Sequence, residues 1–138
     1  MEYEIERVKE FVKAGKALFT VRNENTGGRF TFKIKRADPE KELWFVSVLN
    51  GTDNYSNYCY IGSIFGNGNE FKKTRNSKVT EDAQCFKVFS WFWNKLIKDS
   101  LPTNIKVYHE GRCGRCGRRL TVPESIQSGF GPECINFI

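Results

Sequence analysis

Three cysteines and the only histidine of the chain lie in residues 109–138, with the spacing H-x3-C-x2-C-x17-C: His109, Cys113, Cys116 and Cys134. Three thiolates and one imidazole are a ligand set of closed, tetrahedral structural zinc sites. Two thiolates three residues apart can hold one ion where the backbone turns tightly, and Gly114 and Gly117 permit such a turn. We therefore expect one structural Zn2+ at these four residues, with no coordination position left for catalysis.

Two interpretations of His109 remain open at the level of sequence. It lies four residues before Cys113, within easy reach of an ion held by the thiols. Alternatively, it is an ordinary residue at the end of a strand, and water or an acidic side chain completes the tetrahedron.

The segment that joins the C-x-x-C to Cys134 has helix-start and helix-stop signals. Thr121 and Glu124 form a T-x-x-E capping box with a proline in the first turn, which predicts a short helix over 122–127. Gly129 is the expected stop of that helix. Residues 131–134 begin another turn or helix, so the chain can fold back onto the C-x-x-C.

The run CGRCGRRLTVPES (113–125), followed by GFGPEC (129–134), resembles a small zinc-binding domain of unknown function that recurs in phage-encoded and bacterial proteins. More loosely, the upstream stretches AGKALFTVRNENTGGRFTFKIKR and FSWFWNKL are similar to small phage-encoded proteins that end in this module. The resemblance implies metal binding and no particular reaction.

The composition is that of one compact domain in a reducing compartment. The chain has 138 residues, is 39% hydrophobic and contains five cysteines, an odd number that fits a disulfide framework poorly. Cys59 and Cys85 lie on apolar segments, which is typical of small buried side chains. The apolar run 89–93 is too short to span a bilayer, and the acidic N-terminus is unlike a secretory signal. We expect a cytoplasmic protein, in the host cell if it is phage-encoded.

Hydrophobic periodicity predicts an α+β fold. Apolar residues recur at helical spacing over 2–13 and again from an N-cap at Thr80 to Lys98, where the stripe is broad and aromatic. Runs of period two over 18–22 and 30–34 flank an N-T-G-G turn and predict a β-hairpin. Further strands are expected over 43–49, 58–65 and 105–109. The result is an antiparallel β-meander of four or five strands, packed by an aromatic-rich helix (domain 1–108), with a small zinc-knuckle module (109–138).

A net charge of +6 permits contact with nucleic acid. The candidate cations and rings for nucleic-acid or partner binding are Lys72, Lys73, Arg75, Lys78, Arg112, Arg115, Arg118, Arg119, Tyr55, Tyr58 and Tyr60. Cations for phosphates and rings for stacking are typical of proteins that bind single-stranded nucleic acid. The alternative is that the lysines form a solvated loop, the tyrosines pack at the sheet margin, and the arginines cover sulfur or carbonyl groups of the module.

Catalysis is not expected. A filled Cys3His site has no open position, the H-x-E signature of zinc deaminases is absent, and there is no Gly-rich phosphate loop with a lysine. Neither a small-molecule substrate nor a membrane is indicated. The sequence favours a non-catalytic protein that binds nucleic acid or a host complex that handles nucleic acid. The alternative is an inhibitor of a host protein without nucleic-acid contact, for which the polar, aromatic segment 50–60 offers a recognition loop.

Overall fold

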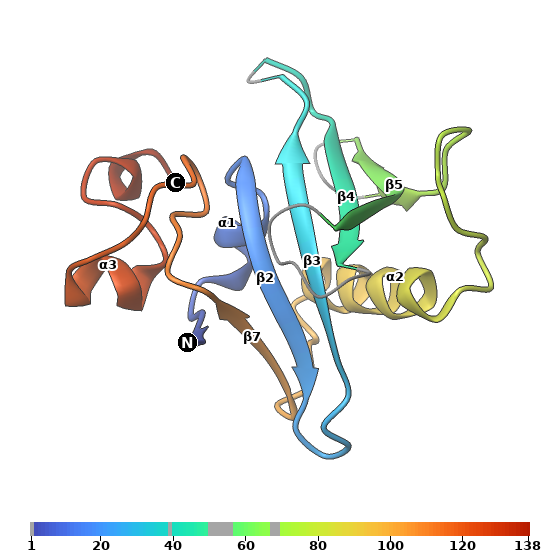
Figure 1. Cartoon of the computed structure of the whole chain (residues 1–138), viewed down its shortest axis with the longest axis horizontal. Helices are drawn as coiled ribbons and strands as arrows, with labels where there is room; N and C mark the ends of the chain where they lie inside the picture. The colour runs from blue at the N-terminus through green and yellow to red at the C-terminus, as the bar shows by residue number, and fades with distance from the viewer. Residues whose placement is uncertain (1, 39, 50–56, 67–69) are drawn as a thin grey trace.

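The computed structural model describes residues 2–38, 40–49, 57–66 and 70–138 of the chain. Its described strands form one antiparallel sheet of seven strands in the order β1-β7-β2-β3-β4-β5-β6 (Figure 1). The strands are β1 (Tyr3–Glu4), β2 (Lys16–Asn23), β3 (Arg29–Arg36), β4 (Trp44–Leu49), β5 (Tyr58–Phe65), β6 (Glu70–Lys72) and β7 (Ile105–His109). The predicted α+β class is confirmed. The sheet is larger than predicted because β1 and β6, both very short, add one strand at each edge.

The β2–β3 hairpin is the centre of the sheet, and its predicted alternation is confirmed. Phe19 pairs with Phe32 across the two strands, and both side chains are fully buried. The turn between them uses Gly27, whose φ of 76° lies in the left-handed region that glycine adopts without strain. Its N–H donates to the carbonyl of Asn23 at 2.8 Å, which closes the turn.

One face of the sheet is covered by the long helix α2 (Gln84–Ile97), which crosses behind β3 and β4 in Figure 1. Ring contacts join the helix to the strands: Phe89 meets Phe32 edge-on at 4.9 Å between centroids, and Phe92 lies 6.0 Å from Phe19. Burying each such ring contributes roughly 1.5–3 kcal/mol. The aromatic stripe predicted for this helix is therefore the core of the protein.

Both predicted helix starts in the N-terminal part need correction. The first helix, α1, covers only Val8–Val12, because Tyr3 and Glu4 instead pair with His109 and Tyr108 of β7. Helix α2 begins after Ala83, and no side-chain hydrogen bond caps it, so Thr80 is not its N-cap.

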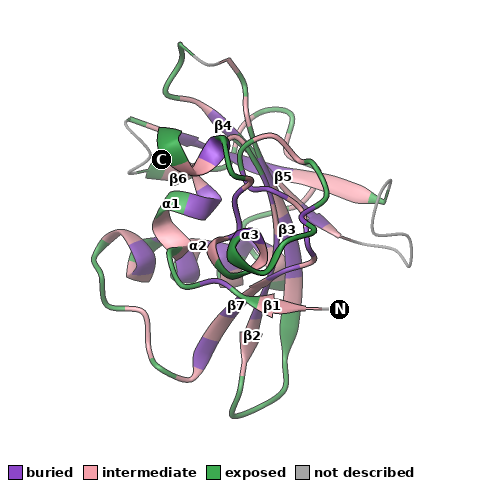
Figure 2. Ribbon diagram, turned by 90° about the vertical axis from the view of Figure 1, so that its left-hand side faces the viewer, coloured by how far each residue is buried: buried purple, intermediate pink, exposed green. Residues whose placement is uncertain are grey.

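The C-terminal module contains α3 (Pro123–Ser128) and a 3-10 turn, η1 (Cys134–Phe137). Gly129 ends α3 in the left-handed conformation, as predicted, whereas the capping box fails: the N-cap is Val122 and has no side-chain cap. Figure 2 shows the module beside the β1–β7 edge of the sheet. No helix among the described residues has both the length and the apolar character needed to cross a bilayer.

Candidate metal centre

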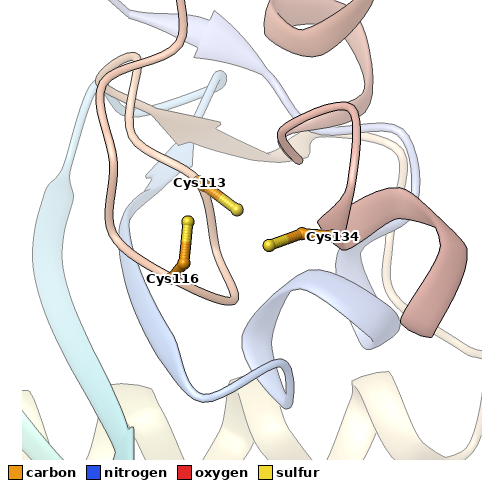
Figure 3. Close-up of side chains that lie close together, drawn as sticks. All are labelled: Cys113, Cys116 and Cys134. Atoms are coloured by element: carbon orange, nitrogen blue, oxygen red, sulfur yellow. The ribbon is translucent and has the colours of Figure 1, made fainter.

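Three thiols meet in the C-terminal module. The Sγ atoms of Cys113, Cys116 and Cys134 all lie within 4.8 Å of one another, and none of the three is in a disulfide. Figure 3 shows the three side chains converging from the C-x-x-C turn and from the start of η1. Zn–S bonds of about 2.3 Å place tetrahedral sulfurs about 3.8 Å apart, so a small contraction would fit the group to one ion.

The backbone around Cys113 forms the tight knuckle that the two glycines predicted. The Gly117 N–H donates to the Cys113 carbonyl at 2.9 Å, and the Cys113 N–H donates to the Arg118 carbonyl at 2.8 Å. Gly117 has a φ of 79°, which favours glycine at this position. The turn therefore brings Cys116 back beside Cys113.

Backbone N–H groups lower the pKa of the Cys113 thiol. Burial raises the pKa of this thiol, but hydrogen bonds from the N–H groups of Cys116, Gly131 and Arg115 outweigh it, and the pKa lies below its usual value. The Gly131 N–H lies 3.4 Å from the sulfur. Donation of backbone N–H groups to sulfur is the arrangement that supports a metal-bound thiolate.

Cys134 lies in a different environment. Burial raises the pKa of its thiol, the Arg115 side chain lowers it, and the two neighbouring thiols raise it further, with a net upward shift. Arg115 donates from Nη1 to the Cys134 sulfur at 3.5 Å, and its guanidinium stacks on Phe137 at 4.3 Å from the ring centroid. Three thiolates with one divalent cation would carry a charge of −1, which Arg115 offsets.

The structure does not bring His109 to the thiols. Its Nδ1 accepts a hydrogen bond from the Gly111 N–H at 3.0 Å, and its Nε2 lies 2.7 Å from the Ile126 carbonyl oxygen, to which it donates. The ring is fully buried and stacks on Tyr3 and Phe11, at 5.4 and 5.7 Å between centroids. His109 is therefore not placed as the expected metal ligand, because it ends β7 with its side chain in the buried core.

In the described part of the chain, no histidine, aspartate, glutamate or further cysteine joins the three sulfurs. Tetrahedral coordination would therefore need a fourth donor from outside this set, such as water. A hollow of about 480 Å³ lies beside Cys116 and Cys134 and gives solvent access to the site. Among the described residues, the structure therefore shows a three-thiol group that could hold a metal ion, and the closed Cys3His tetrahedron stays a prediction.

Two of the knuckle arginines donate to groups of the C-terminal module. Arg112 donates to the Gly117 carbonyl at 3.2 Å, and Arg115 covers sulfur, as the alternative interpretation expected for such arginines. Arg118 and Arg119 are exposed and line the hollow together with Arg115.

The other predicted cations lie at the far edge of the sheet. Lys72 ends β6 and pairs with Glu70 at 2.8 Å, and Lys73, Arg75 and Lys78 follow in the exposed segment between β6 and α2. Because β6 and β1 are opposite edges of the sheet, the structure does not bring these residues to the knuckle arginines.

The predicted tyrosines lie in and beside β5. Tyr58 is half-buried beneath the ammonium of Lys33, at 4.9 Å from the ring centroid. The Tyr60 hydroxyl is held by Ser63 and Thr74. Tyr55 and the predicted turn at 50–54 lie outside the described residues.

Sequence analysis did not identify the roles of Phe11, Lys33 and Lys35. Phe11 anchors the module: it contacts His109 and Phe130 and fills the space beside Gly114 and Gly129. Sequence analysis also assigned no role to Lys33 and Lys35. Their alternation with apolar residues in RFTFKIKR was the available signal that both point away from the core.

Comparison with known proteins adds one finding for this part of the chain. The model of a family of unknown function (DUF6011) matches residues 106–135, which contain β7, the C-x-x-C, α3 and Cys134. The match supports the resemblance of the C-terminal segment to a small domain of unknown function, and covers less than half of the chain. No curated protein and no solved structure matches the chain.

Proposed function

We propose that this chain is a non-catalytic protein that holds one structural Zn2+ through Cys113, Cys116 and Cys134. The observation that supports it most directly is the convergence of three free thiols within 4.8 Å on a knuckle whose N–H groups donate to sulfur. Zinc is the metal that thiolate-rich, tetrahedral protein sites most commonly hold. With three thiolates the site would carry a net charge of −1, which suits a structural role better than Lewis-acid catalysis.

The ion would tie the C-terminus of the chain to the sheet. Cys113 and Cys116 follow β7 directly, whereas Cys134 arrives after α3 and two glycine turns. One bond from the ion to Cys134 therefore closes a loop that contains α3. Because such a site does not exist in the unfolded chain, metal affinity adds directly to the stability of the module.

The proposed activity is binding of nucleic acid, directly or as part of a host complex that handles nucleic acid, in the cytoplasm of a phage-infected cell. The support is the net charge of +6 and the two exposed groups of cations, on the knuckle and after β6. A protein that neutralises phosphates in this way loses affinity steeply as salt rises.

Two measurements test the proposal. Elemental analysis of protein purified without added metal should find one zinc per chain, and a chelator should remove it together with the folded signals of residues 109–138. A mobility-shift titration at two salt concentrations should show binding that weakens with salt. Zinc without nucleic-acid binding would favour the protein-inhibitor alternative, which capture of a host protein resistant to nuclease would support.

A further inference from the structure

The second face of the sheet, which we call the open face, carries no helix in the described part of the chain. Helix α2 packs against Phe19, Phe32 and Phe71, and α1 lies on the same side, where Phe11 stacks on His109. Because side chains alternate along a strand, the intervening residues point to the opposite side. This side faces the viewer in Figure 1.

The charge of the open face is predominantly positive. Its charged residues on the named strands, placed by the strand register, are lysine or arginine except Glu4 and Glu70: Lys16, Arg22, Arg29, Lys33, Lys35, Lys72 and Lys106. Some have carboxylate partners, such as Glu24 for Arg22 at 3.8 Å and Glu2 for Arg29 at 3.3 Å. Lys16, Lys33 and Lys35 have no carboxylate partner among the described residues.

One cross-strand row joins the two groups of cations that sequence analysis identified. Successive pairs in the register give the row Lys16, Lys35, Phe45, Ser63 and Lys72 across β2 to β6. Strands about 4.8 Å apart make this row roughly 19 Å long. At one end of the row, Lys16 lies beside the knuckle: a Cβ built on Gly117 would be 3.5 Å from the Cδ atom of Lys16. At the other end, Lys73 follows β6.

Exposed or half-buried rings lie among these cations. Phe45 is 40% exposed although it is a large apolar side chain in a sheet, and it meets Tyr60 edge-on at 6.0 Å between centroids. Tyr60 is further held through its hydroxyl by Thr74 at 2.9 Å. Tyr58 lies beneath the ammonium of Lys33, at 4.9 Å from the ring centroid. Rings held in place beside cations provide surfaces on which bases can stack.

The arrangement of the lysines does not stabilise the fold. Lys16 and Lys35 face each other directly across β2 and β3, and like charges in that position are destabilising. Phe45, at the centre of the row, likewise adds little to stability, because its exposed ring buries little apolar surface. A polyanion with aromatic groups would relieve both features at once, because its phosphates would neutralise the lysines and its bases would cover the ring.

We propose that the open face binds single-stranded nucleic acid along the row from Lys16 to Lys72, with Phe45, Tyr58 and Tyr60 as stacking positions. This inference rests on the proposed nucleic-acid binding and names its surface and the form of the ligand. Duplexes are disfavoured because their bases are already stacked and present no free faces to Phe45.

The test uses fluorescence anisotropy of the full zinc-loaded chain with labelled oligo-dT and oligo-U of about twelve nucleotides, within the site sizes of single-strand binders. Lys33→Glu with Lys35→Glu should weaken binding at least about tenfold, and Lys33→Gln with Lys35→Gln should reduce the salt slope by about 1.4. Phe45→Ala should weaken binding by about tenfold, with little change in the salt slope.

The matched control is Lys87→Glu with Lys98→Glu, which makes the same charge change at an exposed position of α2 and at its exposed C-cap, and should leave affinity nearly unchanged. Loss of binding in Lys73→Glu with Arg75→Glu, but not in the open-face variants, would overturn the inference and leave the proposed function standing. Tighter binding of a duplex of equal length would overturn the choice of single strands. A wild-type chain that binds none of these probes would refute the nucleic-acid proposal itself.

Discussion

The ring of Phe11 lies against the backbone of Gly114, where an added Cβ would come within 2.7 Å of the ring carbon Cδ2. The same ring also excludes a side chain at Gly129, with a Cβ-to-Cδ2 distance of 2.8 Å. A residue of α1 is thus enclosed by two glycines of the C-terminal module. The module is packed onto the rest of the chain through this ring as well as through the β1–β7 edge.

Gly114→Ala should therefore destabilise the protein by about 1–3 kcal/mol, the usual cost of overpacking. Phe11 has no space into which to move, because it is fully buried and stacks on His109. Urea unfolding measures the effect. The matched control is Gly131→Ala, where a Cβ would meet nothing within 4 Å, so its stability should change by less than about 0.5 kcal/mol. Equal losses in the two variants would contradict the packing argument.

Cys116→Ser should abolish stoichiometric zinc binding, with affinity reduced at least about a hundredfold, since even second-shell changes cost up to that much. The module should then lose protection in hydrogen exchange, because affinity for the metal is folding free energy. Cys85→Ser is the control, since this half-buried thiol of α2 is outside the metal group. An unchanged melting curve and a full zinc content in Cys116→Ser would show that the three thiols do not form the site.

The imidazole of His109 should stay neutral at pH values below its ordinary pKa. Burial lowers the pKa of its imidazole, although the Ile126 carbonyl opposes that effect. In the unfolded chain the group takes up a proton near pH 6.5, whereas in the folded chain it resists protonation. Its contribution to stability is therefore fully present above about pH 6.5 and is lost as pH falls toward the lower folded pKa.

Nitrogen NMR of the ring can test this without ambiguity, because the chain has one histidine. The expected tautomer carries its proton on Nε2, which donates to Ile126, while Nδ1 accepts from Gly111. Addition of zinc should leave both nitrogens uncoordinated. A nitrogen shift of metal-bound type would restore His109 as the fourth ligand.

His109 also shows where sequence reasoning reaches its limit. The three cysteines could be grouped from their spacing because C-x-x-C fixes two thiols locally and the glycines allow the third to return. The direction of the His109 side chain depends instead on its pairing with Phe19 and Tyr3 in the sheet, a contact between distant parts of the chain. Spacing along the chain carries no information on that pairing.

The helices and strands divide in the same way, into those that the local sequence predicts and those that depend on pairing with a distant segment. The β2–β3 hairpin and α2 were predictable because each has its own periodicity and its own turn or apolar stripe. Residues 2–13 have a helical pattern, yet Tyr3 and Glu4 join the sheet because β7 offers an unpaired edge. Edge pairing of this kind overrides local propensity, which is a weak prior. The lysine row was likewise hidden, since it exists only once five strands are in register.

The metal should have one exchangeable position, because only three protein ligands are present among the described residues. In the Co2+-loaded protein, adding imidazole or a small thiol should shift the visible absorption bands, with the hollow beside Cys116 and Cys134 giving access. His109→Gln should give the same shift and retain the metal, since glutamine can keep both polar contacts. Bands insensitive to every added ligand would mean that a fourth protein ligand closes the site.

The single substitution Lys35→Glu should raise the stability of the fold and at the same time weaken the binding of nucleic acid. The substitution places an acid directly opposite Lys16, so a like-charge pair becomes an opposite-charge pair, and stability should rise by about 0.2–1 kcal/mol at low salt. Because both side chains are exposed, the gain should shrink as salt increases. The same change should weaken oligo-dT binding, since it reverses a cation in the row. A variant that becomes more stable yet binds as well as wild type would mean that the lysines of the open face serve some purpose other than contact with phosphates.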